Sequence, residues 1–181
     1  MTQTKSSLRL KRMVIFSNDY EVYNEEFHAG TNIIRGENGS GKSTIMNLIF
    51  YSLGGDLKDW TPQMLRCDSI IAEFLINNTP ITLSREIGES SRKPMSIYYG
   101  SYEEAINSKV EGWNIFSYNI SNTKKSFSQE LFELLDFPEM RSEFESNITM
   151  HQLLRLIYLD QKSPADSLFI REDFDSPLVR K

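Results

Sequence analysis

The sequence predicts a mixed α/β fold, of the α+β kind, and three observations support this prediction. Apolar residues alternate with polar ones in the first two thirds, apolar residues recur at helical spacing in the last third, and a glycine-rich loop joins an apolar run to a helical pattern. The chain has 181 residues, of which 39% are hydrophobic. This length suits one domain with a substantial core and is too short for two.

Strand patterns dominate the first two thirds of the chain. Two pairs of apolar runs are each interrupted by residues typical of turns, Ser17-Asn18-Asp19 in the first pair and residues 77–80 in the second. The second pair is predicted to be a β-hairpin. In order, the expected strands cover residues 8–16, 21–27, 70–76, 81–83, 96–99 and 113–118. The segment 68–120 is therefore expected to be rich in β-structure.

Helical spacing of apolar residues is found in three places. The first helix is expected to begin near Lys42 and to stop at Gly54-Gly55. A second, capped by Ser126 or Ser128, is expected to end at residues 136–138. A third, with Asn147 or Thr149 as its cap, carries leucines as far as residue 159.

Residues 36–44 match the phosphate-binding pattern G-x-x-x-x-G-K-[ST] in full. The apolar run 31–35 before it is expected to be a buried strand, so 31–54 has the order strand, loop, helix. Glycines let the backbone N–H groups approach a phosphate closely, and Lys42 should reach the β- and γ-phosphates while Ser43 ligates Mg²⁺. The predicted contacts to a nucleoside triphosphate are Gly36, Glu37, Asn38, Gly39, Ser40, Gly41, Lys42, Ser43 and Thr44.

Composition limits the other possibilities. The net charge of −5 argues against a uniformly basic surface for nucleic acid, and the local groups at residues 5–12 and 124–125 are interpreted as solvated faces. The single cysteine, Cys67, cannot form an internal disulfide and is given no chemical role. No apolar stretch is long enough to span a bilayer, so a cytoplasmic protein without a membrane partner is expected.

The stretch 156–164 has two opposed interpretations. Four apolar residues before Asp160 could be a Walker B strand whose aspartate holds Mg²⁺, as in a self-contained P-loop kinase or NTPase. Alternatively a helix ends there, and Gln161 begins a loop that reaches the metal and the attacking water. The second interpretation is favoured because the apolar spacing from Leu153 is helical and only Ile157 among the four is β-branched.

In the order of these features the chain resembles the N-terminal half of the ATPase head of SMC-like proteins. That group includes the RecF and RecN relatives and the DNA double-strand-break repair ATPase that partners a nuclease. The resemblance implies a P-loop NTPase fold, the N-terminal lobe of an ABC-type ATPase head, formed as one ATP-binding lobe over 1–181 whose helical segment 126–164 ends in the Q-loop. It implies ATP and Mg²⁺ as cofactors, Lys42 and Gln161 as catalytic residues, Ser43 and Gln161 at the metal, and Asn18 near the adenine or ribose.

The resemblance also implies partners. In that family a C-terminal lobe, joined through a coiled coil, supplies the signature motif, the Walker B segment and the catalytic glutamate, and two heads form a homodimer around ATP. No Leu-Ser-Gly-Gly signature occurs in this sequence. The chain alone is therefore expected to be a head fragment with little or no ATP hydrolysis, and DNA and a nuclease or other effector subunit are the expected partners of the full assembly.

The biological role stays open among DNA repair, chromosome maintenance and defence against phage or plasmids. A nucleotide-gated interaction module without catalysis is a further alternative to the ATPase lobe.

Overall fold

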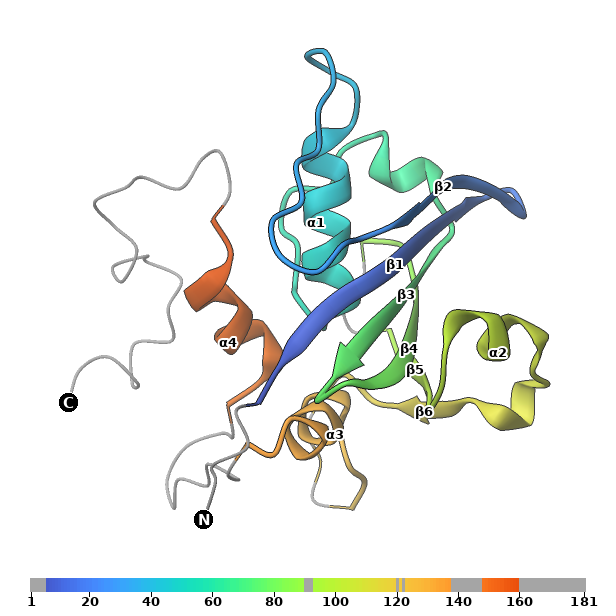
Figure 1. Cartoon of the computed structure of the whole chain (residues 1–181), viewed down its shortest axis with the longest axis vertical. Helices are drawn as coiled ribbons and strands as arrows, with labels where there is room; N and C mark the ends of the chain where they lie inside the picture. The colour runs from blue at the N-terminus through green and yellow to red at the C-terminus, as the bar shows by residue number, and fades with distance from the viewer. Residues whose placement is uncertain (1–5, 90–92, 120, 122, 138–147, 160–181) are drawn as a thin grey trace.

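The computed structural model describes residues 6–89, 93–119, 121, 123–137 and 148–159. In that part of the chain, strands and helices are mixed as predicted (Figure 1). The regular elements are β1 (Leu8–Ser17), β2 (Tyr20–Glu26), α1 (Lys42–Ser52), β3 (Ser69–Ile76), β4 (Thr79–Glu86), β5 (Met95–Tyr98), α2 (Tyr102–Asn107), β6 (Asn114–Phe116), α3 (Phe127–Leu134) and α4 (Met150–Ile157), with short 3₁₀ turns at Met64–Arg66 and Val110–Gly112.

The strands form one antiparallel sheet in the order β2-β1-β3-β4-β5-β6. The β1–β2 turn has positive φ angles of 49° at Asn18 and 64° at Asp19, and the β3–β4 turn has 49° at Asn77 and 67° at Asn78. Asn and Asp tolerate this left-handed region, which tight hairpin turns require. Both predicted turns are confirmed, although Thr79 already begins β4 instead of prolonging the break.

Strand β1 changes its alternation at Lys11. The register against β3 shifts between Leu10 and Arg12, and as a result Leu10 and Met13 both pack on the same core. Strict alternation would place residues 10 and 13 on opposite faces of the sheet. The β-bulge therefore lets β1 present apolar side chains to the core along its whole length.

Helices cover both faces of the sheet unequally. α1, α3 and α4 lie on one side and α2 on the other (Figure 1). On the α2 side, Val14 is fully buried, and Tyr102 and Ala105 of α2 are each 2% exposed. The main core lies on the α1 side, and its buried members include Met13, Ile15, Leu48, Tyr51, Ile70, Phe74, Leu83, Ile97, Phe127, Leu131, Met150 and Leu154.

The expected strand at 31–35 is not present. Residues 31–37 are outside helix and strand, and Ile33 is 70% exposed. A strand needs a neighbour for its backbone N–H and C=O groups, and none of the described strands pairs with this run. The predicted buried strand is therefore wrong: only Ile34 of these five residues is partly buried, and no strand among the described residues supplies the hydrogen-bonding partner.

The three predicted helices are confirmed, with Ser126 capping α3 and Thr149 capping α4. Because α4 extends to Ile157, the first two of the four apolar residues before Asp160 are helical and the other two are outside helix and strand, so the interpretation of these four as a Walker B strand is wrong. The short helix α2 was not predicted, although Ser101 and Glu104 form the capping box that marks its start. None of the helices in the described ranges has the length and apolarity needed to cross a bilayer.

Candidate functional site

The phosphate-binding loop leads into α1 through glycines with left-handed backbones. Gly39 has φ 83° and Gly41, the N-cap of α1, has φ 88°, a region that side chains with a Cβ avoid. At Gly36 an added Cβ would lie 2.4 Å from the Ser40 hydroxyl oxygen, so a larger residue would force the Ser40 side chain to move. The predicted glycine roles therefore agree with the backbone geometry of the loop.

The N-terminus of α1 has no side-chain cap. Gly41 makes no capping hydrogen bond, so the first N–H groups of the helix lack the acceptor that a Ser, Thr, Asp or Asn would provide. Uncapped N–H groups and the positive end of the helix dipole suit an anion at this place. The loop is chemically fitted to hold phosphate oxygens.

Lys42 closes the loop on itself. Its Nζ donates to the carbonyl oxygens of Gly36 at 2.9 Å and Glu37 at 2.7 Å. These contacts place the ammonium group over the loop, where a phosphate oxygen would compete with the two carbonyls for it. The predicted role of Lys42 as a phosphate ligand thus requires an exchange of hydrogen bonds, which a charged acceptor favours.

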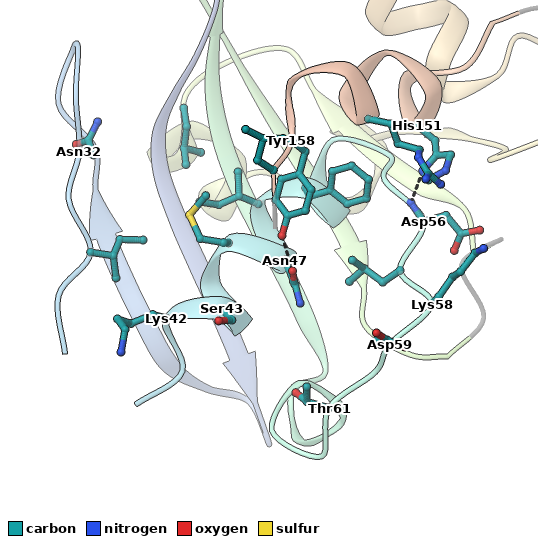
Figure 2. A pocket seen from close by; sticks show the side chains of 18 of the residues that line it. Asn32, Lys42, Ser43, Asn47, Asp56, Lys58, Asp59, Thr61, His151 and Tyr158 are labelled. Atoms are coloured by element: carbon teal, nitrogen blue, oxygen red, sulfur yellow. Dashed lines mark hydrogen bonds between the residues drawn. The ribbon is translucent and has the colours of Figure 1, made fainter. Parts of the chain in front are cut away.

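A cleft of about 860 Å³ opens beside Lys42 and Ser43 (Figure 2). Helix α1 forms one wall, the loop after it a second, α4 with the two residues that follow it a third, and β1 with residues 27–34 a fourth. Its polar lining is made of Asn32, Lys42, Ser43, Asn47, Asp56, Lys58, Asp59, Thr61, His151, Arg155 and Tyr158, and its apolar lining of Leu10, Phe27, Ile34, Met46, Ile49, Phe50, Leu57 and Leu159.

Of the predicted site residues that the structure describes, Lys42 and Ser43 line this cleft. Asn18 is not among the residues that line it, and its backbone N–H donates to the Asp68 carboxylate at 2.5 Å. The neighbouring Ser17 hydroxyl donates to the Arg66 carbonyl at 2.6 Å, so the β1–β2 turn is fastened to the segment before β3. Gln161 and Asp160 lie outside the described residues, and their predicted roles stay predictions.

A magnesium site would use few protein ligands. Within the described ranges no group of three or more His, Cys, Asp and Glu side chains could hold a metal ion. Mg²⁺ bound with a nucleotide needs only one or two protein oxygens because phosphates and waters complete its shell. The Ser43 hydroxyl at the start of α1 fits that requirement.

Helix α4 borders the cleft through contacts that sequence analysis did not identify. The backbone N–H of Asp56 donates to His151 Nδ1 at 2.9 Å, and the Tyr158 hydroxyl donates to Asn47 Oδ1 at 2.5 Å (Figure 2). Phe50 packs between these two side chains, with ring centroids 5.8 Å from His151 and 4.6 Å from Tyr158. One signal was available for Asn47: it follows Ser43 by one helical turn and so shares its face.

The C-terminal end of α1 is held by a buried arginine of β4. Arg85 is 1% exposed, and its Nη1 donates to the carbonyls of Tyr51 at 2.5 Å and Gly55 at 2.9 Å. Its guanidinium carbon lies 3.6 Å from the Tyr51 ring centroid, and the Tyr51 hydroxyl donates to the Glu86 carbonyl at 2.7 Å. Burial lowers the pKa of Arg85 and raises that of Tyr51.

Three of the basic residues considered for DNA contact, Lys11, Arg12 and Lys125, pair with carboxylates. Lys11 Nζ lies 2.9 Å from the buried Glu73, and Arg12 Nη1 lies 2.6 Å from Glu103. Lys125 pairs with Glu130 at 2.6 Å. These ion pairs favour the interpretation of the cations as parts of solvated faces rather than as a DNA surface.

Comparison with known proteins agrees with this geometry. Residues 7–175 match the profile of a family described as AAA domain. The chain belongs to this family. It is also 25% identical over 158 residues to the DNA double-strand break repair Rad50 ATPase of Sulfolobus acidocaldarius.

That alignment covers 73% of this chain and 18% of the relative, so the chain spans less than a fifth of that protein's length. The family and the relative confirm the predicted resemblance to the N-terminal region of an SMC- or Rad50-like ABC-type ATPase. The predicted P-loop NTPase fold is confirmed by the same match.

Proposed function

We propose that this AAA domain is the ATP-binding N-terminal lobe of an SMC-like ATPase that acts on DNA and hydrolyses ATP only with a C-terminal lobe and a second head. The observation that carries the proposal is the start of α1. There, left-handed glycines, uncapped helix N–H groups and the Lys42 ammonium converge beside a cleft that also holds Ser43. ATP with Mg²⁺ is the proposed ligand.

Exposed apolar side chains at the cleft support a second lobe. Met46 and Leu159 line the cleft and are 43% and 62% exposed. Ile33 and Ile157, which adjoin cleft residues in the chain, are each 70% exposed. A lobe that pairs with the backbone of residues 31–35 and covers these side chains would complete both the sheet contact and the burial.

The proposed action on DNA comes from the relative. Its printed name assigns it to repair of DNA double-strand breaks. By analogy, the full assembly here would be a homodimer of heads that carries a coiled coil, engages DNA and works with a nuclease or another effector in repair, chromosome maintenance or defence. In it, Gln161 would contact Mg²⁺ and the attacking water, and Asn18 the nucleoside.

The fold disfavours a self-contained small-molecule kinase. Enzymes of that kind alternate strands and helices around a parallel sheet from the P-loop onward. Here the described sheet is antiparallel, and helix α4 extends to Ile157, three residues before Asp160. A nucleotide-gated module without catalysis differs from the ATPase lobe only in turnover, so it is an outcome of the test below.

The test is ATP turnover by reconstitution. The lobe is mixed with the product of the gene segment that follows it, and ATP hydrolysis is measured with and without double-stranded DNA. We expect turnover only in the mixture, stimulation by DNA, and loss of turnover in Lys42→Ala. A mixture that binds ATP but never turns it over would support the non-catalytic module, and a wild-type lobe that hydrolyses ATP alone would contradict the proposal.

A further inference from the structure

One charged side chain of the cleft has no partner among the described residues. Arg155 of α4 lines the cleft, and its Nε is buried without a hydrogen-bond acceptor. None of the ion pairs between described residues includes it. A buried donor without an acceptor is costly, and native proteins nearly always pair such groups with protein, water or a ligand. The guanidinium therefore marks a place where an acceptor is expected.

Arg155 belongs to the α4 wall of the cleft. Residues four apart share a helix face, so Arg155 shares the face of His151, which also lines the cleft. Figure 2 shows His151 on one side of the cleft and Lys42 on the other. Arg155 is thus not part of the phosphate loop, and a nucleotide bound to that loop does not by itself account for it.

The charges around Arg155 favour a single carboxylate over a polyanion. The same cleft is lined by Lys58, Asp56 and Asp59, so acidic groups balance the basic ones on this side. A chain of phosphates needs a basic patch or stripe. One guanidinium suits one carboxylate, to which it can donate two parallel hydrogen bonds. The expected ligand is therefore the side chain of an aspartate or a glutamate.

Exposed apolar side chains next to Arg155 indicate that this carboxylate belongs to a protein. Close to Arg155 in the chain, Leu156 is 49% exposed, Ile157 70% and Leu159 62%. Apolar residues around an arginine are typical of protein interfaces, where arginine is among the residues that contribute most to binding. Interfaces with nucleic acid are instead more polar and strongly basic. The end of α4 thus has the chemistry of a protein-docking surface.

We propose that Arg155 is a residue through which the second lobe docks on the α4 wall, and that it pairs with an aspartate or glutamate of that lobe. The proposal rests on the proposed function, which supplies the lobe. Arg155 also lies in the last turn of α4, where any cation interacts favourably with the helix dipole. Lysine would provide that interaction equally but cannot donate the two parallel hydrogen bonds, so Arg155→Lys separates the two roles.

The experiment measures, by calorimetry, how tightly the full 181-residue chain binds the product of the gene segment that follows it. We expect Arg155→Ala to weaken this binding by about 10- to 100-fold, because charge-assisted hydrogen bonds are lost, and Arg155→Lys to recover only part of the affinity. The matched control is Arg66→Ala, which removes an exposed arginine outside the cleft and should bind like wild type. Thermal unfolding of each variant chain alone checks that it is folded.

The side-chain Nε–H signal of Arg155 in NMR spectra identifies the class of ligand. The signal is assigned by its absence in Arg155→Lys, and it should shift when the second lobe is added but not when inorganic phosphate or duplex DNA is added. A shift with phosphate or DNA would overturn the proposal, as would wild-type affinity in Arg155→Ala or complete rescue by Arg155→Lys. If the wild-type chain does not bind the second lobe at all, the proposed function fails as well, so the two failures are distinguishable.

Discussion

The two ends of helix α1 are built in opposite ways. At the N-terminal end, Gly41 leaves the helix uncapped and Lys42 donates to two carbonyls of its own loop. At the C-terminal end, Arg85 donates to two carbonyls from within the core and stacks on Tyr51. One end of the helix is thus anchored in the core, while the other leaves its first backbone N–H groups without a side-chain cap.

The largest effect is expected from removing the anchor. Arg85→Met should lower the free energy of unfolding by about 3–5 kcal/mol, because two buried carbonyls lose their charged donor. Chemical denaturation measures it, with Arg66→Met, a change of an exposed arginine, as the control. If Arg85→Met were as stable as wild type, the buried arginine would not be the anchor of α1.

At the N-terminal end of α1, a substitution should affect ATP binding and leave stability nearly unchanged. Lys42→Ala is expected to weaken ATP binding by about 10- to 100-fold, since a charge-assisted hydrogen bond to phosphate is lost, while stability changes by less than about 0.5 kcal/mol. Calorimetry and denaturation on the same variant check both values. Lys125→Ala, which removes a lysine paired with Glu130, should leave ATP affinity unaltered. A large loss of stability in Lys42→Ala would remove the contrast between the two ends.

Helix α4, unlike α1, begins with a side-chain cap. Unlike Gly41 in α1, Thr149 caps α4 through a capping box with Gln152. Thr149→Ala should cost about 1 kcal/mol of unfolding free energy, the usual value of a lost N-cap. Denaturation provides the measurement, and Thr123→Ala, a threonine outside the helices, is the control. If Thr149→Ala were as stable as wild type, this cap would contribute nothing to stability. The absence of a cap at α1 would then say nothing about how the start of that helix differs from the start of α4.

The smallest effect concerns pH at the anchored end. Burial raises the pKa of Tyr51 above its ordinary value of 10. A pKa that is higher in the folded state contributes stability that is complete below pH 10 and is lost as the pH rises through the folded value. Above pH 10 the free energy of unfolding, measured by denaturation, should therefore fall less steeply with pH in Tyr51→Phe than in wild type. Identical slopes in the two proteins would contradict a raised pKa of Tyr51.

Much of the fold was predictable because its signals are local. Asn18-Asp19 and Asn77-Asn78 form tight turns through their own backbone preferences, and the caps of α3 and α4 need only a few neighbouring residues. The run at 31–35 shows the limit of such reasoning. Its apolar residues were visible, but whether they form a strand depends on a partner that local sequence does not specify.

The candidate site divides in the same way. By itself the sequence determined the phosphate loop, since glycine spacing and the adjoining Lys42 and Ser43 dictate a backbone that cradles an anion. Only the tertiary structure decided the bulge at Lys11, the Arg85 anchor and the Tyr158–Asn47 contact. Arg85 and Tyr51 are 34 positions apart in the sequence, and Tyr158 and Asn47 are 111 positions apart. Such pairs meet only after the sheet and helices have packed, so no local sequence pattern predicts them.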